Sequence, residues 1–200
     1  MIAIVDYGMG NLASVLKAVK SLKKEAMITS DKKEIQDASL IILPGVGSFE
    51  QGMKNLKERG FIELLNEEVL QKKKPFLGIC LGMQLMMERG TEPVECKGLG
   101  WIKGKVATIE NSHLPVPHLG WNKTYQFGEG NKEDTISNNF YFIHSFHVLP
   151  EEEVKCTYVD YEFTMVASIQ KENIFATQFH PEKSQEAGLS LLKTYIDSHA

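Results

Sequence analysis

Short apolar segments alternate with amphipathic stretches over the first 90 residues. Each apolar segment is bounded by polar residues, glycine or proline, which is typical of buried strands. The segments predicted as strands are 2–5, 26–29, 39–43 and 75–79. The stretches that repeat apolar residues at helical spacing, and are predicted as helices, are 12–25, 50–59, 61–72 and 81–89. This alternation predicts an α/β fold with a mostly parallel central sheet and helices on both faces.

The second half of the chain has a different pattern, which predicts an antiparallel, strand-rich part. Its strand-like segments and closing helix are 140–146, 165–169, 174–179 and, for the helix, 186–197. Residues 128–139 are polar and contain glycine, which predicts a surface loop or a long hairpin. No linker or internal repeat divides the chain, so we expect a single domain over residues 1–200.

Composition narrows the class of protein. The 200 residues are 42% hydrophobic and 24% charged, which is ordinary for a globular domain. A net charge of −4 gives no reason to expect nucleic acid as a partner, and no apolar run approaches the roughly 20 residues of a membrane span. Three cysteines without a CxxC pair argue against a disulfide framework or a zinc knuckle. We therefore expect a cytoplasmic protein that binds neither nucleic acid nor membrane.

Candidate chemistry begins at Cys80, which lies between Gly78 and Gly82 where a predicted strand meets a predicted helix. Free cysteine is often buried, so one interpretation is plain packing. The other is a nucleophile on a strained turn, the cysteine form of the G-x-S-x-G elbow, where the helix N-terminus lowers the pKa of the thiol. Gln84, one helical turn later, lies on the same face and is a candidate substrate contact.

A nucleophilic thiol needs a base and a group that orients the base. Of the six histidines, His180 ends an apolar segment and is followed by Pro181 and Glu182, so the carboxylate can hold the imidazole. The alternatives are a structural histidine at a strand end and a zinc ligand, because H-x-E opens the zinc-deaminase signature. The companion P-C-x-x-C is missing, which argues against a metal site.

Two further loops follow predicted strands: DYGMGN at 6–11 and PGVG at 44–47. Sites in parallel sheets form beyond the carboxyl ends of the strands, so we expect both loops and Cys80 to share one edge. Glycines that flank a loop residue let backbone N–H groups face a cleft, as an oxyanion hole requires. A plain tight turn is the alternative for PGVG.

Together these motifs resemble the class I, triad-type glutamine amidotransferase family. The marks of the family occur in its order, as PGVGSF (44–49), GICLGMQ (78–84) and QFHPEKS (178–184). Finer motifs extend the resemblance to nearly the whole chain and to one subfamily, the glutaminase subunits of imidazole glycerol phosphate synthase: DYGMGN, KGLGW (97–101), PHLGWN (117–122) and YFIHSF (141–146). The resemblance implies a single-domain, flavodoxin-like α/β fold, no cofactor, and a role in histidine biosynthesis.

The resemblance also implies roles for individual residues. Cys80 would attack the side-chain amide of L-glutamine, His180 would move protons, and Glu182 would orient His180. The oxyanion would lie near the backbone N–H groups of Leu81 and of Val46 or Gly47. The residues that would hold the substrate glutamine are Gln84, Glu92, Ser145 and Phe146.

A partner subunit is implied as well, because the family transfers ammonia directly to a second active site. For this subfamily the partner is a (β/α)8-barrel cyclase, which forms a heterodimer with the glutaminase. The residues that would face it are Asn11, Trp121, Tyr141 and Lys183, with plain core packing as the alternative for the two aromatic residues. Three other functions stay open: a paralogue that supplies ammonia to a surface sugar, a stand-alone cysteine γ-glutamyl hydrolase, and a non-enzymatic interaction module.

Overall fold

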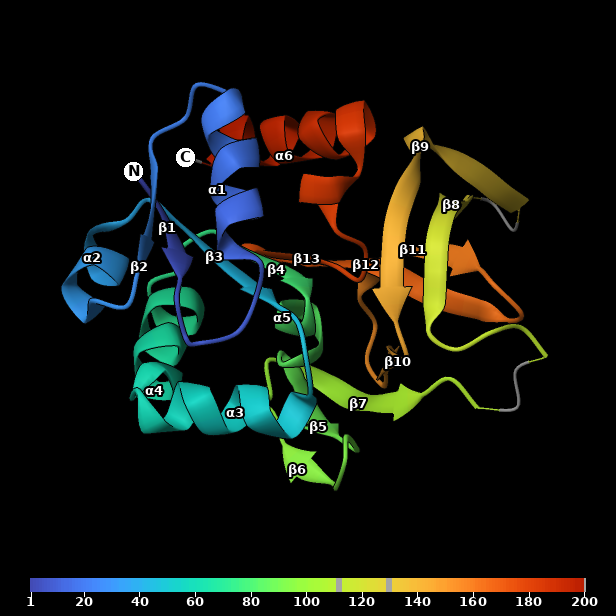
Figure 1. Ribbon diagram of the computed structural model, residues 1–200, viewed down its shortest axis with the longest axis horizontal. Coiled ribbons are helices and arrows are strands. Elements are labelled where there is room, and N and C mark those ends of the chain that lie inside the picture. Colours follow the sequence, from blue (N-terminus) through green and yellow to red (C-terminus); the bar gives the residue numbers. More distant parts are fainter. Residues whose placement is uncertain (111–112, 129–130, 200) are drawn as a thin grey trace.

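The computed structural model describes residues 1–110, 113–128 and 131–199. Five parallel strands occupy one half of its large sheet: β1 (Ile2–Val5), β2 (Ala26–Thr29), β3 (Leu40–Gly45), β4 (Phe76–Cys80) and β13 (Ile174–Thr177). Four antiparallel strands continue it: β12 (Thr164–Lys171), β11 (Lys155–Asp160), β8 (His118–Gly128) and β9 (Asn131–His144). The order across this sheet is β2-β1-β3-β4-β13-β12-β11-β8-β9, so the predicted mixed α/β fold is confirmed (Figure 1).

A smaller sheet packs beneath the large one in the view of Figure 1. Its strands, in spatial order, are β10 (Phe146–Pro150), β7 (Ile102–Thr108), β5 (Met87–Gly90) and β6 (Cys96–Lys97). The chain passes from β9 of the large sheet directly into β10 of the small one, with only Ser145 between them. Ser145 therefore lies at the junction of the two sheets.

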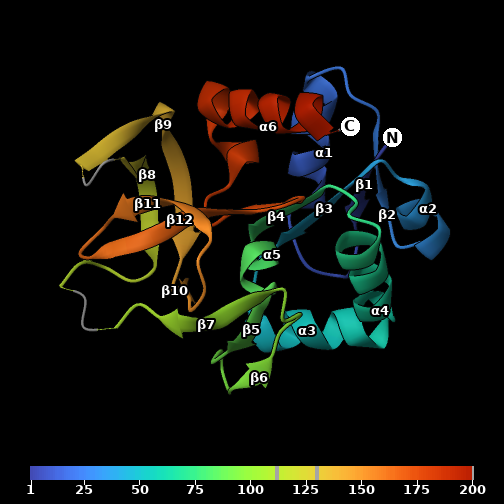
Figure 2. The same ribbon diagram turned by 180° about the vertical axis from the view of Figure 1, so that it is seen from behind.

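Helices cover both faces of the parallel half, as predicted. The helices are α1 (Leu12–Ser21), α2 (Lys32–Asp37), α3 (Phe49–Glu58), α4 (Phe61–Leu65) with a π-helical continuation (Asn66–Gln71), α5 (Leu81–Gln84) and α6 (Gln185–His199). Helices α1 and α6 lie on one face, and α3 and α4 lie on the other (Figures 1 and 2). Alternate residues of β1 enter the two cores, with Ile2 and Ile4 against α1 and α6 and with Ala3 and Val5 toward α3 and α4.

One local prediction is wrong, and one short helix was missed. The apolar run after Cys80 was expected to form a helix over 81–89, but α5 ends at Gln84 and residues 87–90 form strand β5. The backbone carbonyls of Leu85, Met86 and Met87 accept hydrogen bonds from residues 99–102 instead of from the next helical turn. The short helix α2 was not predicted at all, because its six residues contain one buried apolar side chain, Ile35, and therefore show no periodicity.

Other boundaries differ less. The helix predicted over 12–25 ends at Ser21, where Leu22 caps it and Lys23 takes a positive φ of 59°. Of the two structures proposed for 128–139, the long hairpin is correct, because β8 and β9 pair as far as Gly128 and Asn131, and the two residues between them lie outside the described residues. Among the described residues, no helix combines the length and the apolar character needed to cross a membrane.

Candidate active site

The carboxyl ends of adjacent parallel strands bring the candidate residues to one edge. Gly45 ends β3, Cys80 ends β4 beside it in register, and His180 follows β13 on the other side of β4. A cavity of about 380 Å³ opens at this edge. Of the residues predicted for the site, those that line it are Val46, Gly47, Cys80, Leu81, Gln84, Glu92, Ser145, Phe146, His180 and Lys183.

Cys80 lies on a strained turn between β4 and α5. Its backbone has a φ of 54° and a ψ of −109°, a region that residues with a side chain rarely adopt. The flanking glycines are required sterically, since a Cβ at Gly82 would lie 1.8 Å from the carbonyl oxygen of Leu43 and one at Gly78 would lie 2.9 Å from that of Gly82. The side chain is nearly buried but lines the cavity, so the elbow presents its sulfur there.

His180 and Glu182 form a buried pair at the end of β13. Nδ1 of His180 lies 2.7 Å from Oε1 of Glu182, and the short 3-10 turn Pro181–Lys183 sets that spacing. Nε2 of His180 is buried and has no hydrogen-bond partner among the described residues. Burial disfavours the imidazolium, but interactions with Cys80 and Glu182 outweigh it and raise the pKa of His180 to about 10. The surroundings of His180 therefore favour its protonated imidazole.

The alternatives for His180 are tested by its surroundings. It lines the same cavity as Cys80, which a histidine serving only to cap a strand need not do. No group of three or more histidine, cysteine, aspartate or glutamate side chains placed to hold a metal occurs in the described ranges. His180 therefore lines one cavity with a cysteine and is hydrogen-bonded to a carboxylate.

The candidate oxyanion donors come from two elements. Leu81 is the first residue of α5, whose N-terminus favours negative charge nearby. Val46 and Gly47 follow β3 across from it, and Val46 is 42% exposed. Gly47 has a φ of 107°, in the left-handed region that favours glycine. Glycine at position 47 therefore allows the peptide groups of the PGVG loop to face the cavity.

Two of the candidate substrate residues, Gln84 and Glu92, form hydrogen bonds with other parts of the protein. Nε2 of Gln84 donates to the carbonyl oxygen of Phe146 and to Oε1 of Gln178, both at 3.1 Å. Oε2 of Glu92 accepts from the backbone N–H of Phe49 at 3.2 Å, at the first turn of α3. Burial raises the pKa of Glu92 against the effect of that hydrogen bond. Gln84 and Glu92 thus shape the cavity wall from elements on both sides.

Two residues of the site were missed in the sequence. Nε2 of Gln178 donates to the Cys80 sulfur at 3.7 Å, and Nδ1 of His144 lies 2.8 Å from the carbonyl oxygen of Phe146. Both signals were present in the chain: Gln178 lies two residues before His180, and His144 lies next to Ser145 in YFIHSF. Their roles depend on side-chain directions that the sequence does not specify.

Three of the four residues predicted to face a partner subunit lie close together. The side chain of Trp121 is 47% exposed, so the interpretation as a core residue is wrong for Trp121. The centre of its ring lies 5.9 Å from the centre of the Tyr141 ring, in an edge-to-face arrangement. Nζ of Lys183 lies 5.7 Å from the centre of the Tyr141 ring. Asn11 caps α1, where its Oδ1 accepts from the N–H of Ser14 at 3.4 Å. Trp121, Tyr141 and Lys183 therefore form one cluster, and Lys183 connects it to the cavity.

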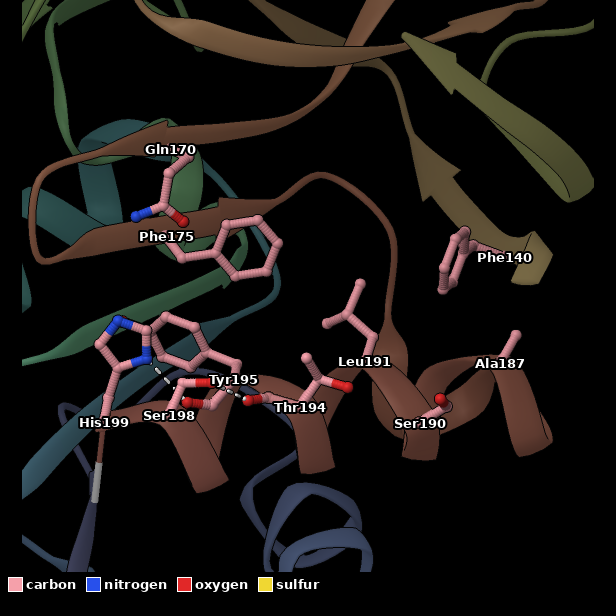
Figure 3. Close-up of a pocket in the computed structure, with 10 residues that line it drawn as sticks. All are labelled: Phe140, Gln170, Phe175, Ala187, Ser190, Leu191, Thr194, Tyr195, Ser198 and His199. Carbon is pink, nitrogen blue, oxygen red and sulfur yellow. Dashed lines mark hydrogen bonds between the residues drawn. The ribbon is translucent and has the colours of Figure 1, made fainter. Parts of the chain in front are cut away.

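A second cavity of about 410 Å³ lies between α6 and strands of the large sheet (Figure 3). Its walls carry aromatic and aliphatic side chains, including Phe140, Phe175 and Leu191. Tyr195 and His199 also line it, and Nδ1 of His199 is bonded to the carbonyl oxygen of Tyr195. Among the described residues that line this cavity, no side-chain nucleophile is hydrogen-bonded to a histidine, so Cys80 remains the candidate for the chemistry.

Comparisons with known proteins point to one family. The family model described as "Glutamine amidotransferase class-I" matches residues 3–196. The chain is 51% identical to "Imidazole glycerol phosphate synthase subunit HisH 1" of Campylobacter jejuni, over 98% of this chain and 99% of that protein. Two proteins of Methanococcus maripaludis, named as subunits HisH 1 and HisH 2 of that synthase, are each 43% identical over 98% of this chain and over 99% and 98% of their own lengths. A solved structure, "Crystal structure of glutamine amidotransferase", shares the fold with a TM-score of 0.73 at 17% identity, covering 98% of both chains.

Proposed function

Because the chain belongs to the class I glutamine amidotransferase family, among the HisH subunits of imidazole glycerol phosphate synthase, we propose that it hydrolyses L-glutamine with Cys80, His180 and Glu182 as a catalytic triad. The observation that carries this assignment is Cys80 on its positive-φ elbow, lining one cavity with a histidine that Glu182 holds. The family predicted from the motifs is confirmed, and the chain is an enzyme, a glutamine amidotransferase.

The mechanism begins with a protonated imidazole, because the pKa of His180 is raised to about 10. The form of Cys80 that reacts is the thiolate. The thiolate attacks the side-chain amide carbon of glutamine, and the N–H groups of Leu81 and of Val46 or Gly47 stabilise the oxyanion. His180 then protonates the leaving nitrogen, so that ammonia departs and a γ-glutamyl thioester remains.

The second half of the reaction uses the same groups in reverse. His180, now neutral, takes a proton from water as the oxygen attacks the thioester, and the collapse of this intermediate releases glutamate and regenerates the thiolate. Glu182 keeps Nδ1 of His180 protonated, so that Nε2 is the atom that exchanges protons with substrate. Ser145 and Phe146 supply backbone groups to the glutamine, on the wall that Gln84 and Glu92 complete.

The ammonia passes to a (β/α)8-barrel cyclase subunit, which uses it to form imidazole glycerol phosphate and an aminoimidazole carboxamide ribotide in histidine biosynthesis. Trp121, Tyr141, Lys183 and Asn11 face this partner in a cytoplasmic heterodimer. An exposed tryptophan beside a second aromatic ring is the kind of residue that anchors protein interfaces. The position of Lys183, shared by the cavity and the aromatic cluster, supports an exit for ammonia on that side.

The decisive test is Cys80→Ala in the complex with the cyclase. Glutamine-dependent synthesis should fall to background, because no thioester forms, while ammonia-dependent synthesis stays within about twofold of the wild-type complex. Both rates are measured by product formation from the same ribotide substrate. Equal loss of the two activities would show that Cys80 supports the fold and not the chemistry.

A second candidate function changes only the ammonia acceptor. Methanococcus maripaludis has two relatives of this chain, which shows that one organism keeps two such subunits. In this alternative, the ammonia is used for amidination of a surface sugar. Complementation of a histidine auxotroph that lacks its own glutaminase subunit separates the two: growth without histidine supports the synthase role, and growth only with histidine supports the other acceptor. A stand-alone γ-glutamyl hydrolase instead predicts brisk turnover without any partner.

A further inference from the structure

A buried hydroxyl lies beside the candidate oxyanion loop without any partner. Tyr7 follows β1, which is the neighbour of β3 in the sheet, so its ring lies at the same edge as Gly45 and Cys80. The side chain is fully buried, and its hydroxyl has no hydrogen-bond partner in the described part of the chain. Buried polar groups nearly always have a hydrogen-bond partner, so an unpaired buried hydroxyl calls for an explanation, of which a catalytic role is one.

The Tyr7 hydroxyl lies close to Gly45, at the start of the candidate oxyanion loop. A Cβ added to Gly45 would lie 2.3 Å from the Tyr7 hydroxyl and 2.8 Å from Cβ of Leu81. The hydroxyl therefore packs against the point where β3 becomes the loop, between that loop and the first residue of α5. Gly45 is a glycine here because no side chain fits between these groups.

The Tyr7 hydroxyl also keeps its proton, so it remains a hydrogen-bond donor. Burial, and then the negative charge at Cys80, raise the pKa of Tyr7 above its ordinary value, so the phenol stays protonated while the thiolate reacts. The interaction with Cys80 places the hydroxyl within electrostatic reach of the nucleophile. A neutral donor in a dry site interacts strongly with any acceptor that turns toward it.

We infer that Tyr7 is a positioning residue, whose hydroxyl donates to the backbone carbonyl of Gly45 or Val46 when the PGVG loop turns the N–H group of the following residue toward the reacting carbonyl of glutamine. A peptide group carries its N–H and the adjoining C=O on opposite sides, so an N–H that faces the cavity directs that C=O toward the protein interior. The buried Tyr7 hydroxyl is a hydrogen-bond donor for that C=O group. The inference rests on the proposed glutaminase function.

The test is Tyr7→Phe in the complex with the cyclase, with glutamine hydrolysis measured at saturating and limiting glutamine. We expect kcat to fall about tenfold with KM within about twofold, because the hydroxyl supports the transition state and not the bound substrate. The thermal midpoint should not fall, because the hydroxyl has no partner in the resting arrangement. The control is Tyr195→Phe, whose hydroxyl already donates to the carbonyls of Phe76 and Asn173 at 2.8 and 3.1 Å. That variant should lose stability and keep its kcat.

Two results would overturn the inference. A Tyr7→Phe complex with a kcat within twofold of wild type would mean that the hydroxyl takes no part in turnover. A lowered thermal midpoint would mean that the hydroxyl already has a partner at rest. If instead the wild-type complex itself fails to hydrolyse glutamine, the proposed function fails, and that outcome is distinct from a Tyr7 effect measured against an active wild type.

Discussion

The parallel and antiparallel halves of the large sheet serve different purposes. In the parallel half, all strands run the same way, so the loops after β1, β3, β4 and β13 emerge at one edge and bring Tyr7, Gly45, Cys80 and His180 together. In the antiparallel half, successive strand ends alternate between the two edges. That half supplies a wall of the cavity and the exposed aromatic cluster at Trp121.

The same residue type behaves differently in the two halves. Cys80 lies on a strained turn next to a histidine. Cys156 lies within β11, where burial, only partly offset by a hydrogen bond from Tyr158, raises the pKa of its thiol to about 11. A thiol with that pKa is almost entirely protonated at neutral pH and is a poor nucleophile. The two cysteines thus differ in position, because Cys80 ends strand β4 and lines the cavity with a histidine, whereas Cys156 lies within a strand.

The largest expected effect concerns the parallel edge. His180→Ala should lower kcat for glutamine hydrolysis by about 10³-fold, because both proton transfers lose their carrier. Glu182→Gln should lower it by only about 10- to 100-fold, because an amide still holds Nδ1 but no longer stabilises the imidazolium. Steady-state kinetics of the complex at saturating glutamine measure both values. If Glu182→Gln lost as much activity as His180→Ala, the carboxylate would be more than an orienting group.

A smaller effect is expected on the antiparallel side, and on binding instead of chemistry. Trp121→Ala should weaken the affinity for the cyclase by about 30-fold, which corresponds to about 2 kcal/mol, because it removes an exposed aromatic anchor. The matched control is Phe127→Ala, since Phe127 is also exposed on β8, at 54% against 47% for Trp121, but lies outside the cluster of Trp121, Tyr141 and Lys183. Titration calorimetry compares the two variants. Equal losses of affinity in the two variants would contradict an interface at the Trp121 cluster.

The smallest effect is a pH dependence of stability with opposite signs at two histidines. The pKa of His180 is raised to about 10, so its stabilisation is fully present below pH 6.5 and is lost as the pH rises toward 10. Burial, opposed by a hydrogen bond to Phe146, lowers the pKa of His144 to about 3, so the folded state loses stability as the pH falls from 6.5 toward 3.

Thermal unfolding of the wild type and of His180→Ala and His144→Ala, followed from pH 3 to pH 10, checks these signs. The His180 variant should flatten the alkaline side of the profile and the His144 variant the acid side, each by a few degrees. A His180 variant that changed only the acid side would contradict the proposed interaction with Cys80.

Much of the parallel half was predictable because its signals are local. The apolar segments at 2–5 and 75–79 and the helical spacing after Leu12 depend on neighbours in the chain, and glycines at 78 and 82 mark the elbow directly. The prediction failed at Met87, where an apolar run fits a helix and a strand equally well. Backbone hydrogen bonds from residues 99–102 favour the strand. These residues lie too far along the sequence to be part of a local pattern around Met87.

By itself, the sequence determined the family, the alternation of strands and helices, and the residue types needed for thiol chemistry, because these depend on motifs and on short-range spacing. Only the tertiary structure decided that residues 100 positions apart line one cavity, that Gln178 contacts the Cys80 sulfur, and that the Tyr7 hydroxyl lies against Gly45 with no partner among the described residues. The physical reason is that burial and side-chain direction are properties of the packed sheet edge, and no single stretch of the chain contains that edge.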